Sequence, residues 1–118
     1  LMAAAFEASG FVARHHIDLA RHAGLEPRRI VATGGGTKAT AWMQALADAT
    51  QLPVDVVAVA EGAALGSAFI ARCVAGLEQN MTDARRWART SRTVEPRGGE
   101  AVQDRYVRFR SLTVDAVA

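Results

Sequence analysis

The sequence contains very little cysteine, because Cys73 is the single one among 118 residues. One thiol excludes an internal disulfide framework and a zinc site built from cysteines, and it fits a reducing compartment. Long apolar runs are also lacking, since no stretch reaches about 18 residues without a charge or a turn signal. No signal-peptide pattern opens the chain. From these absences we expect a soluble, cytoplasmic protein without a membrane partner.

Charge of one sign is not concentrated anywhere in the chain. The formal net charge is +2 with 22% charged residues, and the arginines between Arg85 and Arg110 alternate with acidic and apolar residues. A nucleic-acid-binding protein would be expected to carry a dense basic stripe with aromatic side chains, or a recognisable motif. Neither is present, so we expect no nucleic acid partner and interpret these arginines as a solvated surface.

The chain also lacks a start methionine and an N-terminal capping residue. It opens with Leu1, which stands in the middle of a helical pattern. Its length allows one domain that buries roughly 65% of its unfolded surface. We therefore expect one domain over residues 1–118 and a fragment of a longer chain.

The most informative stretch present runs from Ile30 to Gln44. A β-branched apolar run, Arg29–Thr33, stops at the triplet Gly34–Gly36, and a helical pattern begins near Ala39. This order predicts a strand, a turn that exposes backbone, and a helix N-terminus. Unpaired amides at such a corner suit an anionic phosphate. The unbroken apolar character of the run favours an interior strand covered on both faces.

Two better-known phosphate motifs do not fit this corner. The dinucleotide pattern G-x-G-x-x-G needs a glycine where Ala39 stands, and no acidic residue follows at the required distance. This disfavours a dinucleotide-binding oxidoreductase. The P-loop needs a four-residue spacer and a Lys-Ser/Thr pair, which Gly34–Lys38 lacks. A plain tight connection between the strand and the helix, in which glycine only relieves strain, remains an alternative interpretation.

Periodicity predicts the remaining elements. These are a helix over Met2–Ala20 stopped by Gly24 and Pro27, a helix over Ala39–Gln51, a strand over Pro53–Val59, a helix over Glu61–Gly76, a short helix over Thr82–Arg89 capped by Thr82, an extended segment over Thr90–Glu95, a turn over Pro96–Gly99, and a closing helix with Val102, Tyr106, Phe109 and Leu112. The strand-helix-strand order argues for parallel pairing of the first two strands.

Small residues within the helices predict close packing. Gly10 lies in the apolar stripe of the first helix, where a neighbour can approach. Gly62 and Gly66 make the third helix thin, at roughly 1 kcal/mol for each interior glycine relative to alanine. The sheet, the second helix and a nucleotide all remain open as the neighbour of this third helix.

Four further positions have structural interpretations. We expect Trp42 to be a core residue rather than an adenine stack, Asp48 to make a structural hydrogen bond, and Glu61 to cap its helix. His15, Asp18 and His22 share one side of the first helix, where a metal could bind. No further ligand converges on them, so we expect solvated side chains and no metal site.

Several of these residues together resemble a known family. They are Thr33, Gly34, Gly35, Gly36, Trp42, Gln44, Ala47, Asp48, Pro53, Val54 and the run Glu61–Ala68. Their order and gaps are similar to the C-terminal domain of FGGY carbohydrate kinases, xylulokinase-like members especially. The resemblance extends from about Ala5 to Leu112.

The resemblance implies an α/β fold, namely an actin/Hsp70/hexokinase-like (ribonuclease H-like) kinase domain with a mixed sheet flanked by helices. Such enzymes have two domains and transfer the γ-phosphoryl group of MgATP to a sugar hydroxyl, here xylulose or a related pentulose. The C-terminal domain mainly holds ATP. An N-terminal domain supplies the catalytic aspartate and most of the sugar site, and Mg²⁺ is held mainly through the nucleotide and that domain. No catalytic residue is therefore assigned to this chain, which alone should be inactive. A homodimer stays open.

The resemblance assigns nucleotide contacts to six residues, which are Gly34, Gly35, Gly36, Thr37, Lys38 and Ala39. The glycines approach the phosphates and ribose, and the other three line the start of the helix that contacts adenosine. Ala39 stands where the family usually has Ser or Asn, so one polar contact is lost unless Thr37 or Thr40 supplies it. This departure favours an alternative, a degenerate kinase-fold domain that binds nucleotide or a partner without catalysis.

Overall fold

The structure, a computed structural model, describes residues 1–115. Its elements are α1 (Met2–His22), β1 (Ile30–Ala32), the 3₁₀ helix η1 (Gly35–Lys38), α2 (Thr40–Thr50), β2 (Val54–Val57), α3 (Gly62–Val74), the 3₁₀ helix η2 (Met81–Arg86), β3 (Thr90–Val94) and α4 (Glu100–Asp115). The helices and strands expected from the sequence are present, and η2 is 3₁₀ rather than α-helical. The last three residues of the predicted domain, 116–118, lie outside the described residues.

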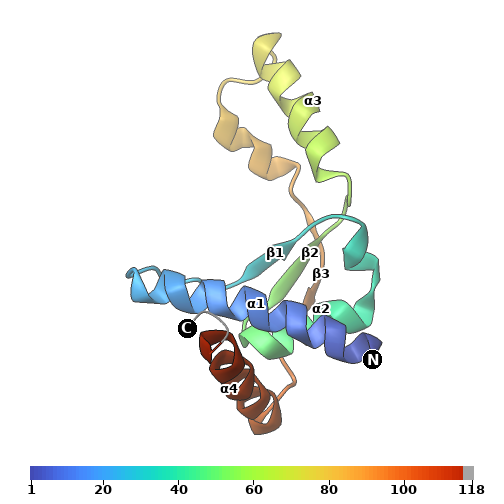
Figure 1. The fold of residues 1–118 in the computed structure, drawn as a ribbon. Coiled ribbons are helices and arrows are strands. Elements are labelled where there is room, and N and C mark those ends of the chain that lie inside the picture. The colour runs from blue at the N-terminus through green and yellow to red at the C-terminus, as the bar shows by residue number, and fades with distance from the viewer. Residues whose placement is uncertain (116–118) are drawn as a thin grey trace.

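The three strands form one mixed sheet in the order β1-β2-β3 (Figure 1). β1 and β2 are parallel, with Ile30 opposite Val54. β2 and β3 are antiparallel, with Val56 opposite Arg92. This confirms the parallel pairing and the mixed sheet expected from the sequence.

The prediction that the first strand is interior is wrong for the described part of the chain. β1 lies at the edge of the sheet, and the side chain of Val31 is 55% exposed. β2 is the central strand, where Val54 is fully buried. Side chains alternate between the two faces of a strand. Ile30 and Ala32 therefore pack into the core while Val31 faces the opposite, less covered side.

The main core fills the space between the sheet and α2, with α1 packed across α2 (Figure 1). Its buried residues are Met43, Ala47, Val54 and Val56, against which Ile30, Ala32, Trp42, Leu46 and Val94 pack. A Cβ built on Gly10 would lie 2.8 Å from the Cβ of Ala49. The close approach expected at Gly10 is therefore confirmed, and α2 is the neighbour.

A second core joins α4 to α1. Phe11 is 5% exposed, and its ring lies 5.6 Å from that of Tyr106 and 5.5 Å from that of Phe109. At the surface, Arg105 Nη2 donates to Glu7 Oε1 over 2.6 Å. The closing helix thus packs back over the domain.

α3 and η2 project away from the rest of the domain (Figure 1). The two elements hold each other, because the buried ring of Phe69 meets Trp87 edge-to-face at 5.4 Å. The close approach predicted for α3 is found at Gly62, whose built Cβ would lie 2.9 Å from Thr33 Oγ1, but at Gly66 no atom lies within 4 Å. Although α3 is rich in apolar residues, no helix within residues 1–115 has the length and apolar character needed to span a bilayer.

Two predicted helix caps differ in the structure. η2 is capped by Asn80, whose side chain accepts a hydrogen bond from the Thr82 amide over 3.1 Å, so Thr82 is not the cap. Glu61 stands at the N-cap of α3 but makes no capping hydrogen bond through its side chain.

Candidate functional site

The glycine corner, Gly34–Ala39, connects the carboxyl end of β1 to the start of α2. The sequence predicts this placement correctly. The path differs in one respect, because a turn of 3₁₀ helix, η1, comes between the strand and α2. Thr37 and Lys38 therefore belong to η1, and Ala39 is the N-cap residue of α2 rather than part of that helix.

The three glycines of the triplet differ in their surroundings. Gly34 has φ +97°, a conformation that side chains rarely adopt. Gly36 leaves room for an indole, since a Cβ built there would lie 2.6 Å from Trp42 Cζ3. Gly35 has neither constraint: it is exposed, and no atom lies within 4 Å of its built Cβ. Gly35 is thus open to a ligand that approaches the backbone.

Hydrogen bonds inside the corner engage its carbonyls. Gly34 O accepts from the Thr37 hydroxyl over 2.7 Å and from the Thr37 amide over 3.2 Å. Gly36 O accepts from the Ala39 amide over 3.1 Å, and Thr37 O accepts from Arg92 over 2.9 Å. Within residues 1–115, the amides of Gly35 and Gly36 have no assigned acceptor. The corner therefore has donors left over, as a phosphate site requires.

The side chains of the corner divide into inward and outward ones. Thr37 is 7% exposed and its hydroxyl already donates to Gly34 O, so its role is to hold the turn. Lys38 and Thr40 are exposed. Of the two threonines that the sequence offers as substitutes for a polar contact at Ala39, Thr40 has the more accessible side chain.

Trp42 is a packing residue, as expected. Its ring stacks on Phe6 with centroids 5.5 Å apart and planes at 9°, and its Nε1 donates to Ser9 Oγ over 2.7 Å. Because both ring and N–H are engaged inside the protein, Trp42 shapes the corner from within.

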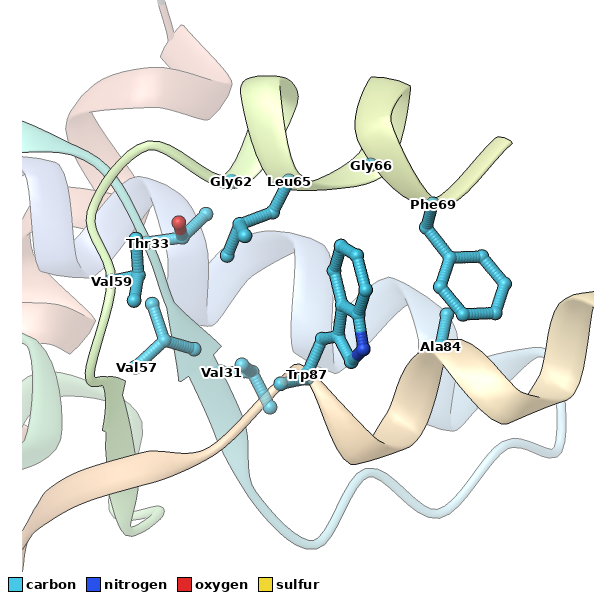
Figure 2. Close-up of a pocket in the computed structure, with 11 residues that line it drawn as sticks. Val31, Thr33, Val57, Val59, Gly62, Leu65, Gly66, Phe69, Ala84 and Trp87 are labelled. Atoms are coloured by element: carbon cyan, nitrogen blue, oxygen red, sulfur yellow. The ribbon is translucent and has the colours of Figure 1, made fainter. Parts of the chain in front are cut away.

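Two hollows flank the corner, and Thr33 borders both. One has a volume of about 480 Å³ and is lined by the residues from Ala32 to Thr37 together with Ser9, Trp42, Met43 and Leu46. The other has a volume of about 270 Å³ and lies between the sheet and α3 (Figure 2). Figure 2 shows Val31 from the sheet, Leu65 from α3 and the indole of Trp87 among the side chains around it. The larger hollow contains the glycine triplet, so it adjoins the unpaired amides.

The possible metal ligands on α1 are used in other ways. Asp18 accepts from Tyr106 over 2.7 Å and from Arg14 over 3.1 Å, and His15 meets Arg110 of α4. Burial raises the pKa of the Asp18 carboxyl, but the hydrogen bonds and the charge of Arg14 lower it by more, so the net pKa is below its usual value. Within the described part of the chain, no three His, Cys, Asp or Glu residues are grouped to hold a metal ion.

Asp48 makes the structural hydrogen bonds expected of it. Its Oδ1 accepts from the amides of Arg97 and Gly98 over 2.6 and 2.8 Å and from Gln44 over 2.9 Å. Burial raises the pKa of this carboxyl, and the hydrogen bonds lower it by more, leaving it below its usual value. Asp48 thereby ties α2 to the turn that precedes α4.

Sequence reasoning missed Arg92, which lies 55 positions after Thr37 and contacts its carbonyl. No local signal identifies this contact, since it depends on the antiparallel register that places Arg92 opposite Val56.

Comparisons with known proteins identify the family and the fold of the chain. Residues 1–75 match the model of the C-terminal domain of the FGGY family of carbohydrate kinases. Because the match covers more than half of the chain, the chain belongs to this family. Two similar curated relatives are autoinducer-2 kinases: that of Escherichia coli O139:H28 is 35% identical over 101 residues, covering 82% of this chain and 19% of its own length. That of Enterobacter sp. strain 638 is 43% identical over 63 residues, covering 53% and 12%.

Solved structures show the same fold. The xylulose kinase from Rhodospirillum rubrum superposes with a TM-score of 0.75 at 30% identity, over 93% of this chain and 23% of that one. The glycerol kinase from Plasmodium falciparum gives a TM-score of 0.68 at 20% identity, over 95% and 22%. The expected actin/hexokinase-like fold is thus confirmed. The chain spans about a fifth of the length of these relatives.

Proposed function

We propose that the chain is the ATP-binding C-terminal domain of a cytoplasmic sugar kinase that transfers the γ-phosphoryl group of ATP to a sugar hydroxyl, with xylulose or a related pentulose as the favoured substrate. The observation that carries the proposal is the pattern of free and engaged backbone groups in the glycine corner. The amides of Gly35 and Gly36 have no acceptor within residues 1–115, while the carbonyls of Gly34, Gly36 and Thr37 are engaged by the protein.

The geometry fits a nucleotide phosphate. Backbone amides form short, strong hydrogen bonds with phosphate oxygens, and the open space at Gly35 lets a ligand reach them. Lys38 is exposed at the end of η1 and adds a positive charge beside the same turn. We infer that Gly34 to Gly36 approach the phosphates and ribose, with Gly34 and Gly36 setting the backbone path and Gly35 giving access. Thr37, Lys38 and Ala39 line the start of the helix that contacts adenosine.

Within this proposal the chain binds and orients the nucleotide. Phosphoryl transfer depends mainly on positioning and on stabilising the charge of the transferred group. ATP with Mg²⁺ supplies the phosphoryl group. The catalytic aspartate, most of the sugar site and most contacts to Mg²⁺ are assigned to the N-terminal domain expected for this family, so the 118-residue chain alone should not turn over.

The sugar is the least constrained part of the proposal. The Rhodospirillum rubrum neighbour is a xylulose kinase at 30% identity, whereas the curated relatives named above are autoinducer-2 kinases at 35% and 43%. We favour the pentulose because the set of residues from Thr33 to Ala68 resembles xylulokinase-like members of the family especially.

Sugar-dependent release of ADP by the intact protein tests the proposal. We expect ADP release with MgATP to require a sugar and to have its highest kcat/KM with xylulose or a related pentulose, compared with glycerol and autoinducer-2. Preferred turnover of autoinducer-2 would support the proposed kinase activity but overturn the proposed sugar substrate. No sugar-dependent ADP release by the folded protein would support the alternative, a degenerate binding module.

The structure weakens the one feature that favours that alternative. Ala39 lies at the N-cap of α2, where Ser and Asn are preferred because their side chains accept from the first helical amides. We therefore interpret the departure from the family at Ala39 as a missing helix cap, which leaves the amides of Gly35 and Gly36 available for the nucleotide.

A further inference from the structure

Arg92 is the middle residue of β3 and lies on the same face of the sheet as the main core. It is paired opposite Val56, which is 5% exposed and belongs to that core. Its Nη2 donates to the carbonyl of Thr37 over 2.9 Å. This hydrogen bond connects the last strand of the sheet to η1.

The contact is made to a glycine-rich turn. η1 has four residues, two of them glycines, and a third glycine precedes it. Glycine loses more conformational entropy on folding than any other residue, so such a turn resists order unless it is held from outside. Inside η1, the bonds from Thr37 close the turn on itself but do not fix it to the sheet.

Within the described residues, the charge of Arg92 is not neutralised by an ion pair. Among the residues whose side chains the structure describes, no carboxylate lies within salt-bridge distance of it. Arg92 is half-buried, and a guanidinium in that setting makes its strongest available hydrogen bond to the Thr37 carbonyl. This hydrogen bond is therefore a means of holding η1 against the sheet.

We propose that Arg92 is a positioning residue for nucleotide binding, which holds η1 through Thr37 so that the amides of Gly35 and Gly36 stay aligned for phosphate. This inference rests on the proposed function. Arg92 itself touches backbone, not substrate, and is not a catalytic residue.

The first test needs no nucleotide. Hydrogen exchange is measured at the amides of Thr37 and Ala39, which donate to Gly34 O and Gly36 O and so report whether η1 is formed. In the ligand-free intact protein, Arg92→Met should speed exchange at both amides by about tenfold, as expected for a charge-assisted hydrogen bond. Arg92→Lys, which keeps a charged donor, should restore part of the protection. Unchanged exchange in Arg92→Met would overturn the anchoring role.

The matched control is Arg89→Met. Arg89 lies just before β3, is exposed, and its side chain makes no hydrogen bond within the described residues. The substitution removes the same charge without touching η1, so exchange at Thr37 and Ala39 should match the parent. Equal acceleration in both variants would assign the effect to net charge and overturn the proposal.

The second test separates the positioning role from the nucleotide site itself. We expect Arg92→Met to raise the Kd for MgATP about tenfold while the Kd for the sugar stays unchanged, with partial rescue in Arg92→Lys. Faster exchange without weaker MgATP binding would overturn the role of Arg92 in nucleotide binding while leaving the site intact. No MgATP binding by the folded parent would instead overturn the proposed function, and the exchange experiment would still decide whether Arg92 anchors η1.

If Arg92→Met does not fold, the comparison of parent with Arg92→Lys decides, with an intermediate loss in both measurements expected.

Discussion

The indole of Trp42 occupies the place that a side chain on Gly36 would need, with 2.6 Å between Cζ3 and a Cβ built on the glycine. One residue earlier, at Gly35, no atom lies within 4 Å of such a Cβ. Two adjacent glycines of one motif therefore have different surroundings. Gly36 is required by packing inside the protein, whereas the space at Gly35 is open to solvent.

This contrast predicts unequal effects on stability. Gly36→Ala should lower the free energy of unfolding of the 118-residue chain by about 1 to 3 kcal/mol, because the indole must move out of its stack with Phe6. Gly35→Ala should change it by about 0.5 kcal/mol or less. Denaturant titration of both variants measures the difference. Equal destabilisation would contradict the packing explanation.

Ala39→Ser should stabilise the chain in the absence of any ligand. The hydroxyl at the N-cap accepts from a free amide in the first turn of α2, which contributes about 1 kcal/mol. Ala41→Ser is the control, because residue 41 lies inside the first turn and is exposed. Thermal unfolding without nucleotide is compared first, and MgATP affinity of the intact protein second. A gain in affinity without any gain in stability would show that the hydroxyl contacts the nucleotide rather than capping the helix.

Local patterns predict the glycine corner because its chemistry is local. The end of a β-branched run, the glycine triplet and the start of α2 are adjacent in sequence. The close packing at Gly10 and the structural hydrogen bonds of Asp48 could also be predicted from the sequence. The edge position of β1 was not predictable, since an apolar run does not reveal how many strands flank it. The contact between Arg92 and Thr37 depends on register across the whole sheet and leaves no local trace.

The α1–α4 contact predicts a specific sensitivity to acid. Asp18 accepts from the hydroxyl of Tyr106, and the net pKa of the Asp18 carboxyl is lowered. A lowered pKa in the folded state stabilises the fold fully above the pKa of an unfolded aspartate, about 3.9, and this stabilisation disappears as pH falls through the folded value. Tyr106→Phe removes one of the hydrogen bonds that lower the pKa, so its stability should fall less between pH 7 and pH 3.

The same variant should lose about 1 to 2 kcal/mol of stability at pH 7, because Tyr106 is buried and its partner is charged. Denaturant titrations at several pH values measure both effects. Ser111→Ala on the exposed side of α4 is the control and should follow the parent at every pH. A parallel acid profile for Tyr106→Phe would contradict the role of its hydroxyl in lowering the pKa of Asp18.

The central claim, that the glycine corner holds the nucleotide, is tested most directly by calorimetry on Gly35→Val in the intact protein. The isopropyl group lies where the ligand must approach the amides of Gly35 and Gly36, so we expect MgATP affinity to fall about tenfold or more while sugar affinity is unchanged. Gly99→Val, at another glycine with open space around its Cβ, should bind both ligands like the parent. Equal losses of MgATP and sugar affinity in Gly35→Val, or unchanged MgATP affinity, would contradict the placement of the nucleotide at this corner.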